Sequence, residues 1–183
     1  MVVAVEPDEG KLAELILYVA EKLLDDAPGG ATKLNKILFF AEFSHMRVHG
    51  VPISGAPYQK LSQGPAPRRL VPIRDRLFDE GAAELRIDDY FGRPLHRIVP
   101  QRPPNLSLFS RDELRIVDQV ITAVWGKTAA EVSEMSHGEM GWKMVDEGED
   151  IPLSSAFLAK RSVATDSIRE HGRELAEKLG VGS

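Results

Sequence analysis

The sequence predicts a mainly α fold of the α+β kind, in which a helical bundle surrounds a central buried helix at about residues 31–49. A small antiparallel β-hairpin is expected at about 83–99. Apolar residues on two sides of the central segment, capped helical segments around it, and one alternating stretch support this class. With 43% apolar composition over 183 residues, the chain can build one sizeable core, so we expect a single domain spanning 1–183.

The central segment has two apolar stripes when it is placed on a helix. One stripe comprises Leu34, Ile37, Leu38, Ala41 and Val48, and the opposite one comprises Phe39, Phe43 and Met46. Between them lie two polar seams: Lys33, Lys36, Ser44 and Arg47 together with Phe40, and Asn35, Glu42 and His49. A helix that is apolar on two sides must be packed from both, so this one should lie centrally. Thr32 is its expected cap and Gly50 its end.

The preceding and following segments read as one-sided helices. Residues 9–24 have a single apolar face, with Asp8 as the N-cap and the Pro-Gly-Gly sequence at 28–30 as the stop. Residues 58–61 can be extended. Pro65 and Pro67 suit the first turn of a helix that runs to about Glu80.

The hairpin and the C-terminal helices carry clearer signals. Residues 84–88 and 95–98 alternate polar with apolar around a loose turn at 91–94, and such a hairpin must lie against the helices to be stable. Three capping-box patterns predict helix starts at Ser110, Thr128 and Ser136. A short extended joint at 151–153, a turn or two at 154–160 and an appended helix at about 164–179 complete the chain.

Charge and cysteine content narrow the functional class. The net charge is −5, from 23 basic and 28 acidic residues, which argues against non-specific nucleic-acid binding. No cysteine is present, so disulfides and thiol catalysis are excluded. The acidic start is unlike a signal peptide, and no apolar run approaches the roughly 20 residues that span a bilayer. We therefore expect a cytoplasmic protein that does not contact membranes.

Catalytic and cofactor motifs are missing from the sequence. It contains no G-x-S-x-G motif and no glycine-rich phosphate loop, and the prolines at 65 and 67 lack the N–H groups that bind phosphate. Glu42, His45 and His49 have a spacing that can bind a metal on one helix face, but no second ligand cluster exists. We expect no catalytic residue, no metal, no cofactor, and partly buried, hydrogen-bonded histidines.

DNA binding is the alternative that the layout leaves open. An arginine-bearing helix followed by a hairpin with Arg86, Arg93 and Arg97 has the order of a winged helix. The two helices around Gly126 can form a helix-turn-helix. Acidic residues between these arginines cancel the local positive charge that DNA-binding surfaces usually carry, so DNA binding is the second hypothesis.

Several motifs resemble the Panacea antitoxin domain, the SocA-like family. They are Lys33–Phe43 (KLNKILFFAEF), Gly50–Gly55 (GVPISG), Tyr58, Gln63–Pro67 (QGPAP), Thr128–Ser133 (TAAEVS), Ser136-His137, Trp142 and Ile151-Pro152. The likeness covers about residues 9–155. Ile37, Phe39 and Gln63 depart from the family pattern, and phenylalanine at 39 lacks the hydroxyl of the tyrosine common there.

The resemblance implies a non-enzymatic antitoxin that neutralises a partner toxin by direct contact. The motif residues expected to have structural roles are Leu34, Phe40, Gly64, Pro65, Pro67, His137 and Trp142. The candidates for toxin binding are Lys33, Lys36, Arg47, Tyr58, Lys60, Arg68 and Arg69. For the basic candidates, two interpretations are open: they contact an acidic surface of the toxin, or they form a solvated seam or an internal ion pair. If they bind, replacing Lys33 and Lys36 by alanine weakens capture without affecting the melting temperature.

Overall fold

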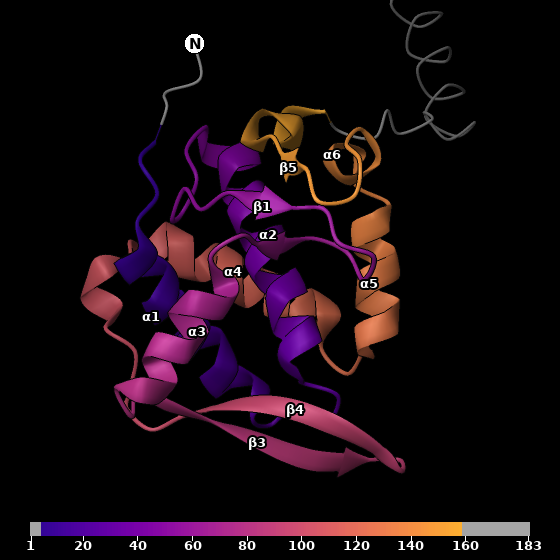
Figure 1. The fold of residues 1–183 in the computed structure, drawn as a ribbon. Helices are drawn as coiled ribbons and strands as arrows, with labels where there is room; N and C mark the ends of the chain where they lie inside the picture. The colour runs from indigo at the N-terminus through magenta and orange to yellow at the C-terminus, as the bar shows by residue number, and fades with distance from the viewer. Residues whose placement is uncertain (1–4, 159–183) are drawn as a thin grey trace, which may run out of the picture.

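The computed structural model describes residues 5–158, and Figure 1 shows helix α2 (Ala31–His49) at its centre. Helices α1 (Glu9–Leu23), α4 (Arg111–Val124) and α5 (Ala129–His137) pack around it. Eleven of the nineteen residues of α2 are buried. The prediction of a central buried helix is therefore confirmed, as is the mainly α class.

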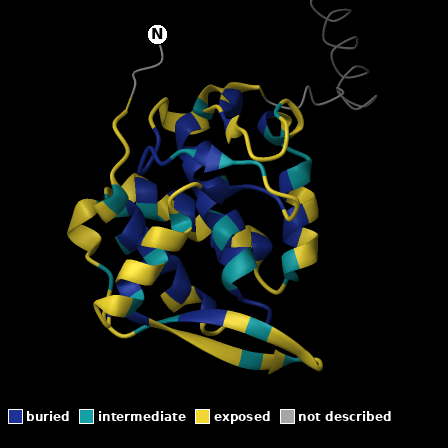
Figure 2. Ribbon diagram, viewed as in Figure 1, coloured by how far each residue is buried: buried dark blue, intermediate teal, exposed yellow. Residues whose placement is uncertain are grey.

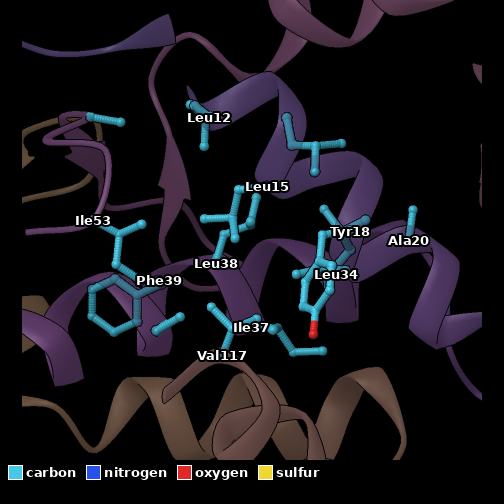
Figure 3. Close-up of a cluster of buried hydrophobic side chains, with 14 of the residues drawn as sticks. Leu12, Leu15, Tyr18, Ala20, Leu34, Ile37, Leu38, Phe39, Ile53 and Val117 are labelled. Carbon is cyan, nitrogen blue, oxygen red and sulfur yellow. The ribbon is translucent and has the colours of Figure 1, made fainter. Parts of the chain in front are cut away.

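Both apolar stripes of α2 face protein. Figure 3 shows Leu34, Ile37 and Leu38 packed between α1 side chains and Val117 of α4. Phe39, Phe43 and Met46 are buried as well. The expectation was wrong for Val48, which is 66% exposed and lies in the exposed last turn of α2 together with Arg47 and His49.

Most helix ends lie where capping chemistry predicts them. Asp8 accepts a hydrogen bond from the Lys11 amide, both capping boxes at Ser110 and Thr128 form, and Gly50 ends α2 with a left-handed backbone. Thr32 is not a cap, because α2 already begins at Ala31 after Gly30.

The predicted third capping box is wrong. Ser136 lies inside α5, where its hydroxyl donates to the Ser133 carbonyl. The following helix α6 (Met140–Lys143) starts after Glu139 without a side-chain cap. An S-x-x-E pattern is thus ambiguous when its serine can bond back within the preceding helix.

The two prolines do not begin a helix. Ala66–Pro67 forms strand β2, which pairs antiparallel with β1 (Tyr58–Gln59), and β1 pairs in turn with β5 (Asp150–Ile151). Proline is tolerated in β2 because it is the edge strand of this small sheet. Helix α3 (Leu70–Asp79) starts only afterwards, so the predicted start at 65–67 is wrong.

The predicted hairpin is present as β3 (Ala83–Tyr90) and β4 (Arg93–Pro100), at the bottom of Figure 1. Its turn is tight rather than loose. Tyr90 pairs with Arg93, which leaves only Phe91 and Gly92 in the turn, with φ angles of 51° and 76°. Positive φ at both positions is the requirement of a type I′ turn, which matches the twist of the strands.

The hairpin is anchored at its base and exposed at its tip. Ile98 is part of the core, and the buried Arg97 guanidinium donates to the carbonyls of Leu23, Ala27 and Gly29 at the end of α1. Towards the turn most residues are exposed, as the yellow colour in Figure 2 shows. Internal contacts thus fix the position of the hairpin without covering its tip.

Short 3₁₀ segments, Leu106–Leu108 and Leu153–Phe157, complete the described chain. The predicted helix at 164–179 lies outside the described residues. No helix within residues 5–158 combines the length and the apolar character that a membrane span requires.

Candidate functional site

Lys33 of α2 contacts the loop before α2 and the loop after α4 through its buried ammonium group. Its ammonium group is fully buried, pairs with the Asp26 carboxylate and donates to the Lys127 carbonyl at 2.8 Å. The other oxygen of Asp26 accepts from the Gly126 amide at 3.0 Å. Lys33 therefore forms the internal ion pair, and its side chain is not accessible to the surface of a partner protein.

Lys36 is buried against the Gly-Pro corner. Its ammonium group donates to the Pro65 carbonyl at 3.0 Å, and burial lowers its pKa to about 8. Gly64 has φ +96°, and a Cβ there would lie 2.5 Å from Ser136 Oγ and 2.7 Å from Lys36 Cε. The corner is therefore fitted to the lysine, and only glycine can occupy position 64 without a shift.

Glu42 ties α2 to the following loop. Its carboxylate accepts from the amides of Ser54 at 2.9 Å and Gly55 at 2.6 Å, and from the Ser54 hydroxyl. Complete burial raises the pKa of Glu42 to about 7 against the opposing effect of these hydrogen bonds. Tyr58 packs edge-on against the rings of Phe39 and Phe43 and is itself fully buried, so it lies inside the protein rather than on a surface.

The histidines near Glu42 do not form a metal site with it. His45 Nδ1 lies 2.7 Å from the Val51 carbonyl, and its ring is tilted by 31° against that of His49, with the ring centres 4.5 Å apart. Within residues 5–158, no group of three metal-ligating side chains comes together.

The remaining basic candidates are at the surface, and each already has a partner. Arg47 donates to the Ala156 carbonyl and pairs with Glu139, Arg68 pairs with Asp150, and Arg69 pairs with Glu9. Lys60 donates to the Val145 carbonyl and lies 4.0 Å from the centre of the Trp142 ring. These four side chains are partly accessible to solvent, but each already has a polar contact within the protein.

His137 and Trp142 stack on each other, with ring centres 4.2 Å apart. With Lys60 on the indole, they connect α5, α6 and the segment after β1. The aliphatic and aromatic motif positions also pack inward: Leu34 is buried, Phe40 lies against the core, and Gly64, Pro65 and Pro67 are buried. All seven positions expected to be structural thus lie in the packed body of the protein.

A second region lies at the tip of the hairpin, which none of the sequence motifs includes. A groove of about 590 Å³ separates the tip from the start of α5 and the loop before α2. Its lining residues are Pro28, Tyr90, Phe91, Arg93, Pro94, Leu95, Thr128, Ala129 and Ala130. The signal in the sequence was a phenylalanine before Gly92, at a position where a hairpin turn prefers asparagine or aspartate.

These features define a mainly helical domain built on a buried signature helix, with a β-hairpin that projects from one end. The family model described as antitoxin SocA-like, Panacea domain, matches residues 34–143. The match covers more than half of the chain, so the protein belongs to this family. The resemblance noted in the sequence is confirmed. Comparisons with curated proteins and with solved structures find no match.

Proposed function

We propose that the protein is a non-enzymatic antitoxin that binds a toxin protein directly and neutralises it. The observation that carries this proposal is the family match over residues 34–143. The packing supports it, because the polar motif residues Lys33, Lys36 and Glu42 have hydrogen-bond partners inside the fold. Such groups stabilise a scaffold, and a rigid scaffold suits a protein that acts by presenting a surface.

The proposed contact residues are those that remain accessible. Arg47, Lys60, Arg68 and Arg69 are kept as candidates, whereas we no longer propose Lys33, Lys36 and Tyr58, because their side chains are buried. The four retained side chains already have polar partners, and exposed ion pairs exchange partners at little cost. We expect single alanine substitutions there to weaken toxin binding only a few-fold.

The test is co-expression with the protein encoded by the adjacent gene. That protein should stop growth when expressed alone and should be harmless when this chain is present, and the two should co-purify. Growth arrest that persists at equal expression levels would contradict the proposal. An unrelated helical protein of similar size, expressed in the same way, controls for the burden of expression.

DNA binding, with the operator of its own operon as the candidate target, stays the alternative, and one feature argues against it. The hairpin carries three arginines and three acids, and two of the arginines are engaged: Arg86 with Asp88, and Arg97 with the α1 end. A gel shift with the DNA upstream of the gene at low salt separates the two functions, because phosphate contacts are strongest there.

A further inference from the structure

Phe91 occupies a turn position where its backbone is strained and its side chain is exposed. A bulky residue with φ 51° is an outlier, because the left-handed region is open mainly to glycine, asparagine and aspartate. The side chain is 89% exposed, so burial does not offset this strain. Its ring contacts that of Tyr90 edge-on, with the centres 4.8 Å apart. Strain at an exposed aromatic points to a role outside folding.

Arg93, two residues further on, has no counter-charge within 4.0 Å among residues 5–158. Of the eleven arginines within residues 5–158, nine lie within 4.0 Å of a carboxylate, and the other two are Arg93 and Arg111. The nearby Asp89 accepts from the Gly92 amide, and the Glu131 carboxylate accepts from the Thr128 amide at the start of α5. The Arg93 guanidinium is therefore available to form an ion pair with a carboxylate that enters the groove.

The groove between these residues and α5 has apolar walls. Pro28, Pro94, Leu95 and the two alanines at the start of α5 contribute them. In Figure 1 the hairpin turn lies at the lower right, below α5, which agrees with this lining. Tyrosine and arginine are the residue types that dominate binding energy in protein interfaces, especially beside a pocket.

From these observations we infer that the hairpin tip is the primary toxin-binding surface: the groove receives an apolar side chain on a toxin loop, and an adjacent carboxylate of that loop pairs with Arg93. This inference rests on the proposed antitoxin function. The occupant is a protein rather than a small molecule, because a small molecule in the groove would cover only the groove side of Phe91, whose side chain is 89% exposed. A partner surface with its own pocket can cover the ring.

The occupant is a loop rather than a strand added to β4, whose residues Arg93, Pro94 and Leu95 line the groove. Because Tyr90 and Arg93 close a two-residue turn, the next pair, Asp89 and Pro94, is the one whose backbone groups point outward. Proline has no N–H to donate there, so the edge of β4 is blocked for strand addition near the tip. Recognition thus depends on side chains.

The experiment uses the full chain and, as the probe, the purified product of the adjacent gene. Phe91→Asn removes the ring and creates the Asn-Gly pair that type I′ turns prefer, so folding is retained. Arg93→Glu reverses the charge. Arg111→Glu is the matched control, since Arg111 is the other arginine in residues 5–158 without an ion pair and lies outside the groove.

We expect Phe91→Asn and Arg93→Glu each to weaken toxin binding at least about tenfold and to abolish growth rescue, as for interface hot spots. Arg111→Glu should bind within about twofold of wild type. Wild-type affinity in both hairpin variants would overturn the inference and leave the antitoxin function standing. A wild-type chain that neutralises nothing would overturn both.

A second copy of this chain is the other occupant of the groove that the experiment must distinguish from the toxin. Size-exclusion chromatography of wild type and Phe91→Asn shows whether the tip holds two copies together. A dimer that becomes monomeric in the variant while toxin affinity stays unchanged would assign the groove to a second copy and overturn the inference. Identical elution volumes together with the loss of toxin binding support it.

Discussion

The buried face of α2 and the tip of the β3–β4 hairpin both carry charged residues, and they differ in what those residues contact. On α2, Lys33 and Glu42 are fully buried and each is hydrogen-bonded to backbone groups from distant segments. At the hairpin tip, Arg93 has no carboxylate partner among residues 5–158, and Phe91 is exposed in a strained turn. The comparison separates residues that maintain the fold from residues left available for a partner.

The largest effect should come from removing Asp26. Replacing it by alanine leaves the Lys33 ammonium buried without its counter-charge and the Gly126 amide without its acceptor. Breaking one side of a buried ion pair costs about 3–5 kcal/mol. Urea denaturation followed by circular dichroism should show this loss in the free energy of unfolding. A loss below about 1 kcal/mol would mean that the pair contributes little to the motif region.

Glu42 should make stability depend on pH. Because the folded pKa is raised to about 7 from the ordinary 4.5, its contribution is fully present below pH 4.5 and is lost as the pH rises through 7. Glu42→Gln retains an oxygen that accepts from both amides but does not titrate. Relative to wild type, the variant should gain up to about 3 kcal/mol in unfolding free energy between pH 5 and pH 8. Parallel stability curves for the two proteins would contradict the raised pKa.

Gly64, in the packed Gly-Pro corner, and Gly92, in the exposed hairpin turn, both have a left-handed backbone and differ in how closely other atoms surround them. Gly64→Ala places a Cβ 2.5 Å from the buried Ser136 hydroxyl, whereas a Cβ at Gly92 meets nothing within 4 Å. Both variants lose about 1 kcal/mol for the backbone, and Gly64→Ala should lose about 2 kcal/mol more through overpacking. Thermal unfolding of the two single variants measures the difference. Equal losses would show that the Gly-Pro corner is less rigid than its contacts imply.

The sequence predicted the body of the protein better than its projecting end. The two apolar stripes of α2 identified the central helix because burial on two sides has a periodic signature. Alternation identified the hairpin, whose strands begin and end within two residues of the prediction. The start of α3 was misplaced because prolines at 65 and 67 suit an edge strand as well as a first helical turn.

The contacts of the charged residues were harder to predict. Lys33 and Lys36 lie in a polar seam of α2. Sequence periodicity identifies this seam but does not predict that Asp26 pairs with Lys33 or that the Pro65 carbonyl accepts from Lys36, because both partners come from other segments. The groove at the tip of the hairpin needs Pro28, Leu95 and Ala129 together, and these come from three separate elements. Only the phenylalanine before Gly92 gave a local hint, since it departs from turn chemistry.

The smallest expected effect on stability is also the one with the opposite sign. Phe91→Asn relieves a bulky side chain from a left-handed backbone and removes an exposed ring, so the free energy of unfolding should rise by about 0.5 kcal/mol. Chemical denaturation measures this change relative to wild type. A decrease of more than about 1 kcal/mol would mean that the ring stabilises the hairpin, and the turn would then no longer distinguish a binding role from a folding role. An increase, found together with weaker toxin binding, separates stability from function at a single residue, because the same substitution would strengthen the fold and remove the contact.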